Sequence, residues 1–542
     1  MSTNAARRVY RARPALLAIL FAGGCAGAIY AQARSAPDWT TQGFDAQRTS
    51  WMRVDPYISL ENLPKFQFIW KLKVDNESRH GSALTAPVAL GNLMTFRGFK
   101  SLIFVGGSSN NVYAIDYDFG TLFWKTHHNY TAGAREYAGS PTCPGGMTVP
   151  LTRAATLNPA TQLGFFGFAR PPRPAKGDVG EPGRGAPQLA EIAARQAARG
   201  AARGASDTPA VTVAPARGTP PPARGTAPVA GRGPNFVFSV AADGLLRGLI
   251  PDTGDLALAP SILLPANATA TGLIWTDGFV YAATSNTCGS APAAVWAMDY
   301  EADTKPVTLW DSAGAPILGI SLGADGTIYA ATGSGTSPYG NAIFALEGKT
   351  LKVKDWFTTG GDGFTSTPVL FTEGERTFVA ATTAGRLYLL DAASLGGADR
   401  RTPLAVTPFA ANVHFGNDGL ATWRDTGGTR WILSEVSGAI GAFKVGDKGA
   451  AKTLERAWTS RNMPLPRTPM IVNGVVFALA AGRAGTNAVL YALDPASGKD
   501  LWNSGTTITS YASAGLSAGT GQVYVVTHDN TVWAFGIPLA IH

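Results

Sequence analysis

The sequence predicts an all-β fold: an eight-bladed β-propeller of four-stranded antiparallel blades, with the ring closed by an N-terminal strand. Three observations predict it. A short motif recurs along the chain at near-constant spacing, and each copy follows a short run of β-branched and aromatic residues. The composition agrees, because only 15% of the 542 residues are charged and 64 are glycine. Long amphipathic helices would need more Glu, Lys and Leu.

The repeated motif is clearest in residues 113–124 (YAIDYDFGTLFW) and 491–502 (YALDPASGKDLW). Both copies have the pattern A-x-D, then Gly four residues after the Asp and Trp four residues after the Gly. The small residue of the motif falls at eight positions, Ala114, Gly248, Ala297, Ala345, Leu389, Ala442, Ala492 and Ala534. From Gly248 onward these positions are 42 to 53 residues apart, which is the length of a propeller blade.

Each repeat is predicted to contain four strands. A triplet that ends in Pro or Gly, such as Thr85-Ala86-Pro87, begins the inner strand, and an apolar strand such as residues 278–284 (GFVYAAT) follows. The other triplets are at 139–141, 270–272, 366–368, 417–419, 467–469 and 513–515, with a weaker copy at 319–321. One blade alone cannot bury both of its apolar faces, so stacking against neighbours is required. The last repeat ends at Ile537-Pro538 without an outer strand, and residues 66–74 (FQFIWKLKV) are expected to supply it.

The N-terminus has the features of an export signal. Four arginines precede an apolar run at residues 15–22, and Ala31-Gln32-Ala33 provides a cleavage site. We therefore expect residues 1–33 to be a signal peptide, no transmembrane domain after cleavage, and a periplasmic or secreted protein. An uncleaved anchor and lipid attachment at Cys25 are the alternatives.

Residues 34–542 are expected to form the single propeller, interrupted in blade two by a disordered Ala/Arg/Gly/Pro-rich insert at 169–234. The insert is either a tolerated surface insertion or a basic tether to an acidic polymer or anionic lipid. The formal net charge of +8 is concentrated in the leader and in residues 165–234, so the rest of the chain is slightly acidic. Because a nucleic-acid binder needs a basic stripe on its folded surface, no nucleic-acid partner is expected.

Two cysteines remain after the leader, Cys143 and Cys288. In an oxidising compartment they form either one disulfide or two separate buried thiols. The chain has no C-x-x-C-H motif for a c-type haem and no C-x-x-C pair for zinc.

The segments that precede the inner strands are expected to converge on the axial funnel. Aligned on the Pro/Gly column, they carry aromatic and charged residues, which suit a flat anionic ligand, because arginine pairs with carboxylates. The candidate cofactor-binding residues are Arg135, Tyr137, His414, Arg467 and Tyr511. The candidate metal ligands are Glu136, Asn417 and Asp418, since Ca²⁺ takes oxygen donors. Alternatively, the aromatic residues only fill the ring and the polar ones are solvated loop residues.

The repeat at 114–124 and 492–502 resembles the tryptophan-docking repeat of quinoprotein alcohol dehydrogenases. The segments WTTQGFDAQRTSW (39–51) and ISLENLPKFQFIWKLKV (58–74) resemble the opening of those enzymes. The resemblance implies pyrroloquinoline quinone (PQQ) in the funnel, Ca²⁺ or a lanthanide held by Glu, Asn and Asp, and an Asp base. This sequence lacks the adjacent cysteine pair of many such enzymes. Outer-membrane assembly lipoproteins share the repeat without a cofactor.

Two functions follow from this reasoning. The first is a ligand-binding or scaffold protein of the cell envelope, with a small molecule or an envelope protein at the axial funnel. The second is a PQQ-dependent alcohol or polyol dehydrogenase that passes electrons to a separate cytochrome. No Ser-His-Asp order, phosphate loop or H-E-x-x-H motif indicates hydrolysis.

Overall fold

The computed structural model describes residues 37–79, 82–129, 140, 143–153, 236–285, 288–410, 412–449 and 451–538. These residues all belong to one compact unit. The predicted signal peptide (1–33) and insert (169–234) lie outside the described residues. Within the described part, no helix is long and apolar enough to cross a membrane.

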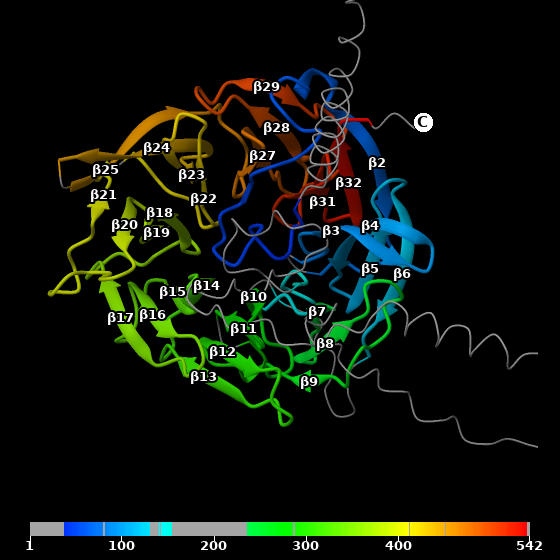
Figure 1. Ribbon diagram of the computed structural model, residues 1–542, viewed down its shortest axis with the longest axis horizontal. Coiled ribbons are helices and arrows are strands. Elements are labelled where there is room, and N and C mark those ends of the chain that lie inside the picture. The colour runs from blue at the N-terminus through cyan, green and yellow to red at the C-terminus, as the bar shows by residue number, and fades with distance from the viewer. Residues whose placement is uncertain are drawn as a thin grey trace, which may run out of the picture. The chain divides into compact units, whose positions relative to one another are not determined.

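The described chain forms eight small antiparallel sheets arranged as blades around a central axis (Figure 1). The predicted eight-bladed propeller is therefore confirmed. Blade 1 contains β3 (Val88–Thr95), β4 (Gly98–Gly106), β5 (Asn111–Asp116) and β6 (Thr121–His127). Blade 2 contains β7 (Val237–Val240), β8 (Leu245–Leu249) and β9 (Ser261–Ile262). Blade 3 contains β10 (Ala270–Thr276), β11 (Phe279–Thr284), β12 (Ala294–Asp299) and β13 (Val307–Asp311).

The remaining blades continue in chain order. Blade 4 contains β14 (Ile317–Leu322), β15 (Thr327–Thr332), β16 (Ala342–Glu347) and β17 (Val353–Thr358). Blade 5 contains β18 (Val369–Glu373), β19 (Arg376–Thr382), β20 (Leu387–Asp391) and β21 (Ala405–Val406). Blade 6 contains β22 (Ala421–Arg424), β23 (Arg430–Val436), β24 (Ala439–Lys448) and β25 (Ala451–Thr459). Blade 7 is β26 (Met470–Val472), β27 (Val475–Ala480), β28 (Val489–Leu493), β29 (Asp500–Asn503), with β1 (Trp51–Met52) added in parallel to β26. Blade 8 is β30 (Ser517–Gly519), β31 (Gln522–Val526), β32 (Thr531–Gly536) and β2 (Gln67–Lys73). Two single-turn 3₁₀ helices, η1 (Leu63–Lys65) and η4 (Cys288–Ser290), lie between strands.

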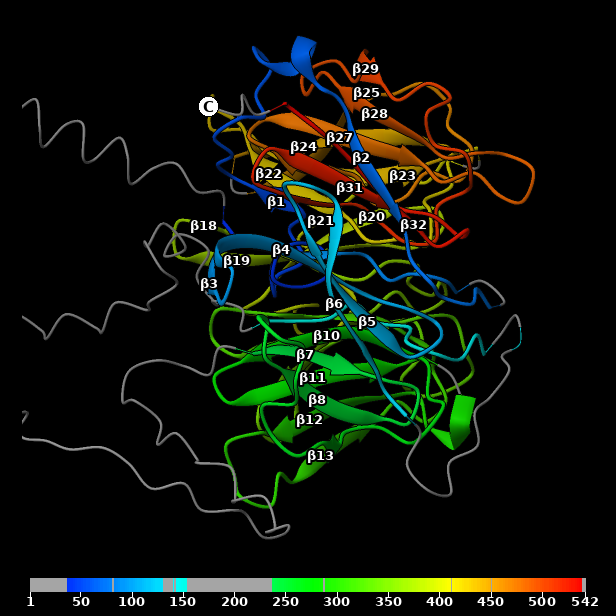
Figure 2. The same cartoon turned by 90° about the vertical axis from the view of Figure 1, so that its right-hand side faces the viewer.

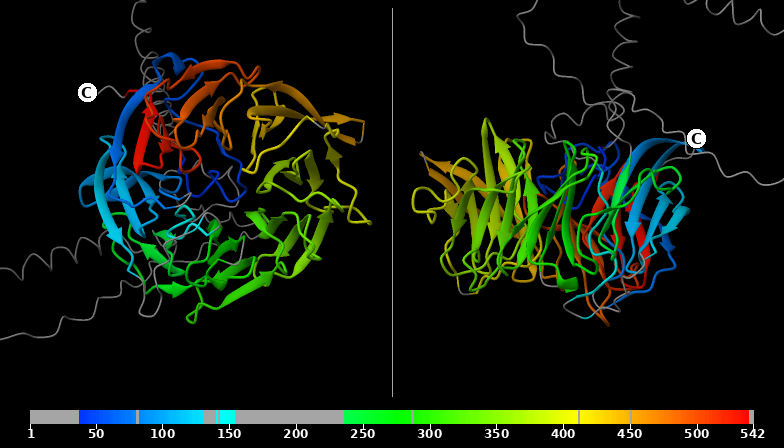
Figure 3. Two further views of the ribbon diagram at one scale, coloured as in Figure 1. Left: turned by 180° about the vertical axis from the view of Figure 1, so that it is seen from behind. Right: turned by 90° about the horizontal axis from the view of Figure 1, so that it is seen from below.

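Ring closure follows the sequence prediction. Strand β2, from near the N-terminus, pairs antiparallel with β32, the last strand of the chain, from Gln67↔Gly536 to Lys73↔Thr531. Figures 2 and 3 show the blue β2 lying beside the red strands of blade 8. The two ends of the propeller thus share one sheet, which leaves no open edge between the first and last blades.

The central strands are buried on both faces because each blade is covered by two neighbours. All side chains of β15, β27 and β31 are buried, whereas the outer strand β6 alternates between exposed and covered positions. The eight small motif residues all lie in strands of this central kind, from Ala114 in β5 to Ala534 in β32. The repeat identified in the sequence is therefore the third strand of seven blades and the middle strand, β8, of the three-stranded blade 2.

Motif tryptophans join neighbouring blades. The indole N–H groups of Trp70, Trp124 and Trp458 donate to the carbonyl oxygens of Tyr117, Pro251 and Pro495, at 2.8, 2.8 and 2.9 Å. Each acceptor lies three residues before a glycine of the next blade, namely Gly120, Gly254 and Gly498. A Cβ atom on any of these glycines would overlap the indole ring, and all three have positive φ. The motif glycine thus makes the tight turn and also makes room for the tryptophan.

Gly498→Ala is therefore expected to destabilise the ring more than Gly374→Ala. Both glycines have positive φ, which costs an alanine about 1–2 kcal/mol, but only Gly498 lies under an indole ring, and Gly374 faces open space. Overpacking adds about 1–3 kcal/mol at Gly498. Urea unfolding of the two variants measures the difference, and equal losses would show that the tryptophan does not need this space.

Candidate functional site

A segment that precedes the first blade closes one end of the axial channel. This floor segment (residues 39–55) appears in dark blue across the middle of the ring in Figure 1. It bonds to every blade in turn. Its partners in blades 1 to 8 are Ala89, Arg153, Leu273, Leu322, Leu370, Thr422, Ile471 and Gly521, at 2.7 to 3.1 Å. Several of these partners lie where inner strands end, such as Leu322, the last residue of β14.

The channel above the floor segment is a cavity of about 400 Å³. All eight blades contribute to its wall, mostly through the residues at which the inner strands begin. The predicted triplets Thr85-Ala86-Pro87, Asn417-Asp418-Gly419, Arg467-Thr468-Pro469 and Ser513-Ala514-Gly515 each supply at least two lining residues. Small residues at these positions keep the channel open, and the volume lies in the range of small-molecule sites.

Blade 2 departs from the predicted pattern. The expected triplet was Gly139-Ser140-Pro141, of which only Ser140 is described. The wall is instead formed by residues between Pro144 and Pro150, because the inner segment of this blade ends at Thr152, which bridges Phe238. Blade 2 accordingly has three named strands rather than four.

Three predicted site residues meet at the cavity wall. Asn417, Asp418 and Arg467 all line it, and Arg467 Nη1 lies 3.5 Å from Asp418 Oδ2. Glu435 completes a charged cluster beside them. Burial raises the pKa of Glu435, the charge of Asp418 adds to this effect, and Arg467 opposes it. The guanidinium of Arg467 therefore interacts with two carboxyl groups, that of Asp418 at the wall and that of Glu435 beside it.

The two other candidates that the structure describes, His414 and Tyr511, do not line the cavity. His414 is exposed, its backbone N–H donates to Ser437 Oγ, and its side chain does not line the cavity. Tyr511 stacks on His528 with ring centroids 4.7 Å apart, also away from the cavity wall. Arg135, Glu136 and Tyr137 lie outside the described residues.

Sequence reasoning missed the floor of the cavity. Arg48, on the floor segment, lines the cavity, yet its side chain is only 5% exposed. Residues 39–51 were noticed only for a resemblance, although a Gly, an Asp and an Arg between two tryptophans could have indicated a turn within the ring. The disulfide that sequence left open is formed: Cys143 and Cys288 bond and join blades 2 and 3.

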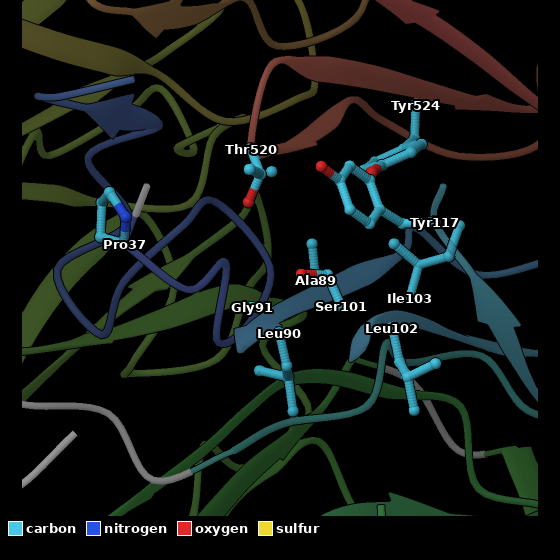
Figure 4. A pocket seen from close by; sticks show the side chains of 11 residues that line it. Pro37, Ala89, Leu90, Gly91, Ser101, Leu102, Ile103, Tyr117, Thr520 and Tyr524 are labelled. Carbon is cyan, nitrogen blue, oxygen red and sulfur yellow. The ribbon is translucent and has the colours of Figure 1, made fainter. Parts of the chain in front are cut away.

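Two further cavities are weaker candidates. One, between blades 8 and 1, lies beside Tyr117 and Tyr524 (Figure 4) and has a volume of about 10 Å³, enough for a single water. The other is a charged groove of about 480 Å³ at blades 5 and 6. Its charges neutralise one another, since Glu373 pairs with Arg430 at 3.4 Å and with Lys452 at 3.3 Å. The axial cavity is thus the best candidate site.

Eight stacked blades, closed by an N-terminal strand and joined by docked tryptophans, define a β-propeller with the fold of the quinoprotein alcohol dehydrogenases. The chain is similar to the quinohemoprotein alcohol dehydrogenase of Comamonas testosteroni, at 14% identity and a TM-score of 0.54, over 94% of this chain and 82% of that one. The chain is also similar to a quinohemoprotein alcohol dehydrogenase of Pseudomonas putida HK5, at 12% identity and a TM-score of 0.53, over 94% of this chain and 81% of that one. A third similar structure is a europium-containing methanol dehydrogenase, at 11% identity and a TM-score of 0.52, over 94% of this chain and 99% of that one. No family model and no curated protein matches the sequence.

The described residues do not assemble the metal centre that this fold implies. Asn417 and Asp418 supply oxygen donors on one loop, but Asp418 is paired with Arg467. Within the described part of the chain, no group of three or more His, Cys, Asp or Glu side chains is placed to hold a metal ion. Ca²⁺ takes about six to eight oxygen ligands. Among the described candidate metal ligands, the wall thus offers Asn417 and one carboxylate that is already paired, fewer oxygen donors than Ca²⁺ takes.

Proposed function

We propose that this chain is a non-catalytic binding protein of the cell envelope that takes a small organic ligand into its axial channel. One observation carries the proposal: a cavity of about 400 Å³, lined by all eight blades and closed at one end by the floor segment. Apolar residues such as Leu84 and Met470 line it together with a few polar side chains, which is the composition of a ligand pocket.

The disulfide supports a location outside the reducing cytosol. Cys143 and Cys288 are bonded, and such bonds persist mainly in oxidising compartments. The leader predicted at residues 1–33 agrees with a periplasmic or secreted protein.

Filling the channel tests the proposal. Ala514 lines the cavity, so Ala514→Phe is expected to place a ring in it and to abolish binding of octanoate and 1-octanol, measured by titration calorimetry. Ala393→Phe is the matched control, because Ala393 is an exposed turn residue and its replacement leaves the channel open. We expect one site per chain in the unmodified protein and in the control.

Two results would overturn this function. If neither octanoate nor 1-octanol binds to the unmodified protein, or if both still bind to Ala514→Phe, the channel is not a ligand site. Dye-linked alcohol oxidation by the purified protein supplied with PQQ and Ca²⁺ would show that it is a dehydrogenase.

A further inference from the structure

We propose that Arg48 and Thr271 form a carboxylate-binding site on the floor of the axial cavity, and that the ligand is a monocarboxylic acid with an apolar body. This inference rests on the proposed function and names the class of ligand. It concerns Arg48 of the floor segment and Thr271 of β10, neither of which is among the candidate site residues that the sequence indicated.

Arg48 is held firmly with one nitrogen left free. Its Nε donates to the carbonyl oxygen of Ile320 at 3.1 Å, and its Nη1 donates to Gln42 O at 2.6 Å and to Thr41 Oγ1 at 3.1 Å. Its Nη2 is buried and has no hydrogen-bond partner in the protein. An unpaired donor of a buried guanidinium is costly, so a ligand oxygen there would be favourable.

The charge of Arg48 is also uncompensated by contact. No described carboxylate lies within ion-pair distance of it, and both oxygens of nearby Asp45 already accept hydrogen bonds from Thr49. Burial lowers the pKa of Arg48 to about 10, and Asp45 opposes this only in part. Because that pKa stays above neutral pH, the cavity floor carries a buried cation.

Two threonines line the same cavity as Arg48. Thr269 and Thr271 line the cavity, and the Oγ1 atoms of both are buried without a partner. The neighbouring Gly272 places this segment beside the guanidinium, since a Cβ on Gly272 would lie 3.3 Å from Arg48 Nη2. The backbone of Arg48 itself has φ +62°, an unfavourable conformation for arginine that the eight-blade contacts of the floor segment hold in place.

These features favour a ligand that has one negative charge and is otherwise apolar. Only one terminal nitrogen of Arg48 is available, which suits a carboxylate better than a phosphate dianion. Asp418 at the wall, and Glu435 beside it, disfavour further negative groups on the ligand. Leu84, Met147 and Leu516 line the same cavity and would cover an aliphatic or aromatic body.

Octanoate, 1-octanol and acetate distinguish the two parts of the proposed ligand. We expect octanoate to bind at least about tenfold more tightly than 1-octanol, because only the carboxylate uses Arg48. Acetate should bind more weakly than octanoate, since it lacks the apolar body. In octanoate labelled with ¹³C at the carboxyl, the pKa of that group is expected to fall on binding, because a nearby cation favours the ionised form.

Thr271→Val tests the site without removing a structural contact. Its hydroxyl bonds to nothing in the protein, so the melting temperature should be kept, while octanoate affinity falls about tenfold and 1-octanol affinity is unchanged. Thr367→Val is the matched control, because the Thr367 hydroxyl also lies at the cavity but already donates to Leu318 O at 3.3 Å. Arg48→Gln should lose the octanoate preference altogether.

The outcomes separate this inference from the proposed function. If 1-octanol binds as tightly as octanoate, or if Thr271→Val and Thr367→Val behave alike, the carboxylate site is wrong although the channel binds ligands. If neither compound binds, the proposed function itself fails. If Arg48→Gln does not fold, the carboxylate site is still tested by comparing Thr271→Val with Thr367→Val and by the pKa of the labelled octanoate carboxyl.

Discussion

A chain that starts at residue 76 is expected to lose the cooperative unfolding transition of the ring. The deletion removes β2, the outer strand of blade 8, and the floor segment that bonds to all eight blades. It also removes Trp70, whose indole joins blade 8 to blade 1. Loss of a buried tryptophan alone costs about 3–5 kcal/mol, a large part of the 5–15 kcal/mol typical of a folded protein.

Thermal unfolding followed by circular dichroism measures this effect. The matched control is a chain that starts at residue 37, which keeps every contact of the floor segment and of β2. It should unfold at the temperature of the full chain. A normal transition in the shorter variant would show that the ring closes without its N-terminal strand.

Breaking the disulfide is expected to give the second large effect. Cys143 and Cys288 are 145 residues apart in sequence, and a crosslink closing a loop of that size stabilises the folded state by about 5 kcal/mol in the chain-entropy model. The loop includes the whole connection from Arg153 to Phe236 in blade 2. Without the bond, blades 2 and 3 are joined only by the chain between β9 and β10 and by non-covalent packing.

Guanidinium unfolding with and without a thiol reductant checks this expectation. The reductant should lower the unfolding midpoint of the natural chain. A variant with both Cys143→Ala and Cys288→Ala should already have the lower midpoint and should not respond to the reductant. Equal midpoints for the reduced and oxidised natural chain would mean that the bond contributes nothing to stability.

The channel wall was predictable because its positions repeat. The triplets at the inner strands recur at fixed distances from the motif strands, so Asn417, Asp418 and Arg467 could be aligned and placed on the wall. Their companion Glu435 was not found. It lies within β23 and reaches the cluster from the second strand of blade 6, a position that the alignment of inner strands did not include.

The aromatic column shows where alignment misleads. Phe364 and Phe415, like Tyr511, lie four residues before the Pro or Gly of their triplets, in the segments expected to converge on the funnel. Both are buried between blades instead. Phe364 forms a bridge with Thr383, directly after the second strand of its own blade, and Phe415 with Val436, the last residue of the second strand of its blade. With the backbone paired in this way, the phenyl group points toward the neighbouring blade, where it buries the most apolar area.

By itself, the sequence determined the blade repeat, the eight-fold ring and its closing strand. These depend on local patterns, namely β-branched runs, turn glycines and docking tryptophans, that recur in every blade and so confirm one another. Only the tertiary structure decided that residues 39–55 close the channel, that Arg48 lies on the floor and that the two cysteines bond. Those features depend on contacts between residues far apart in sequence, made once each, and a contact that occurs once leaves no periodic signal in the chain.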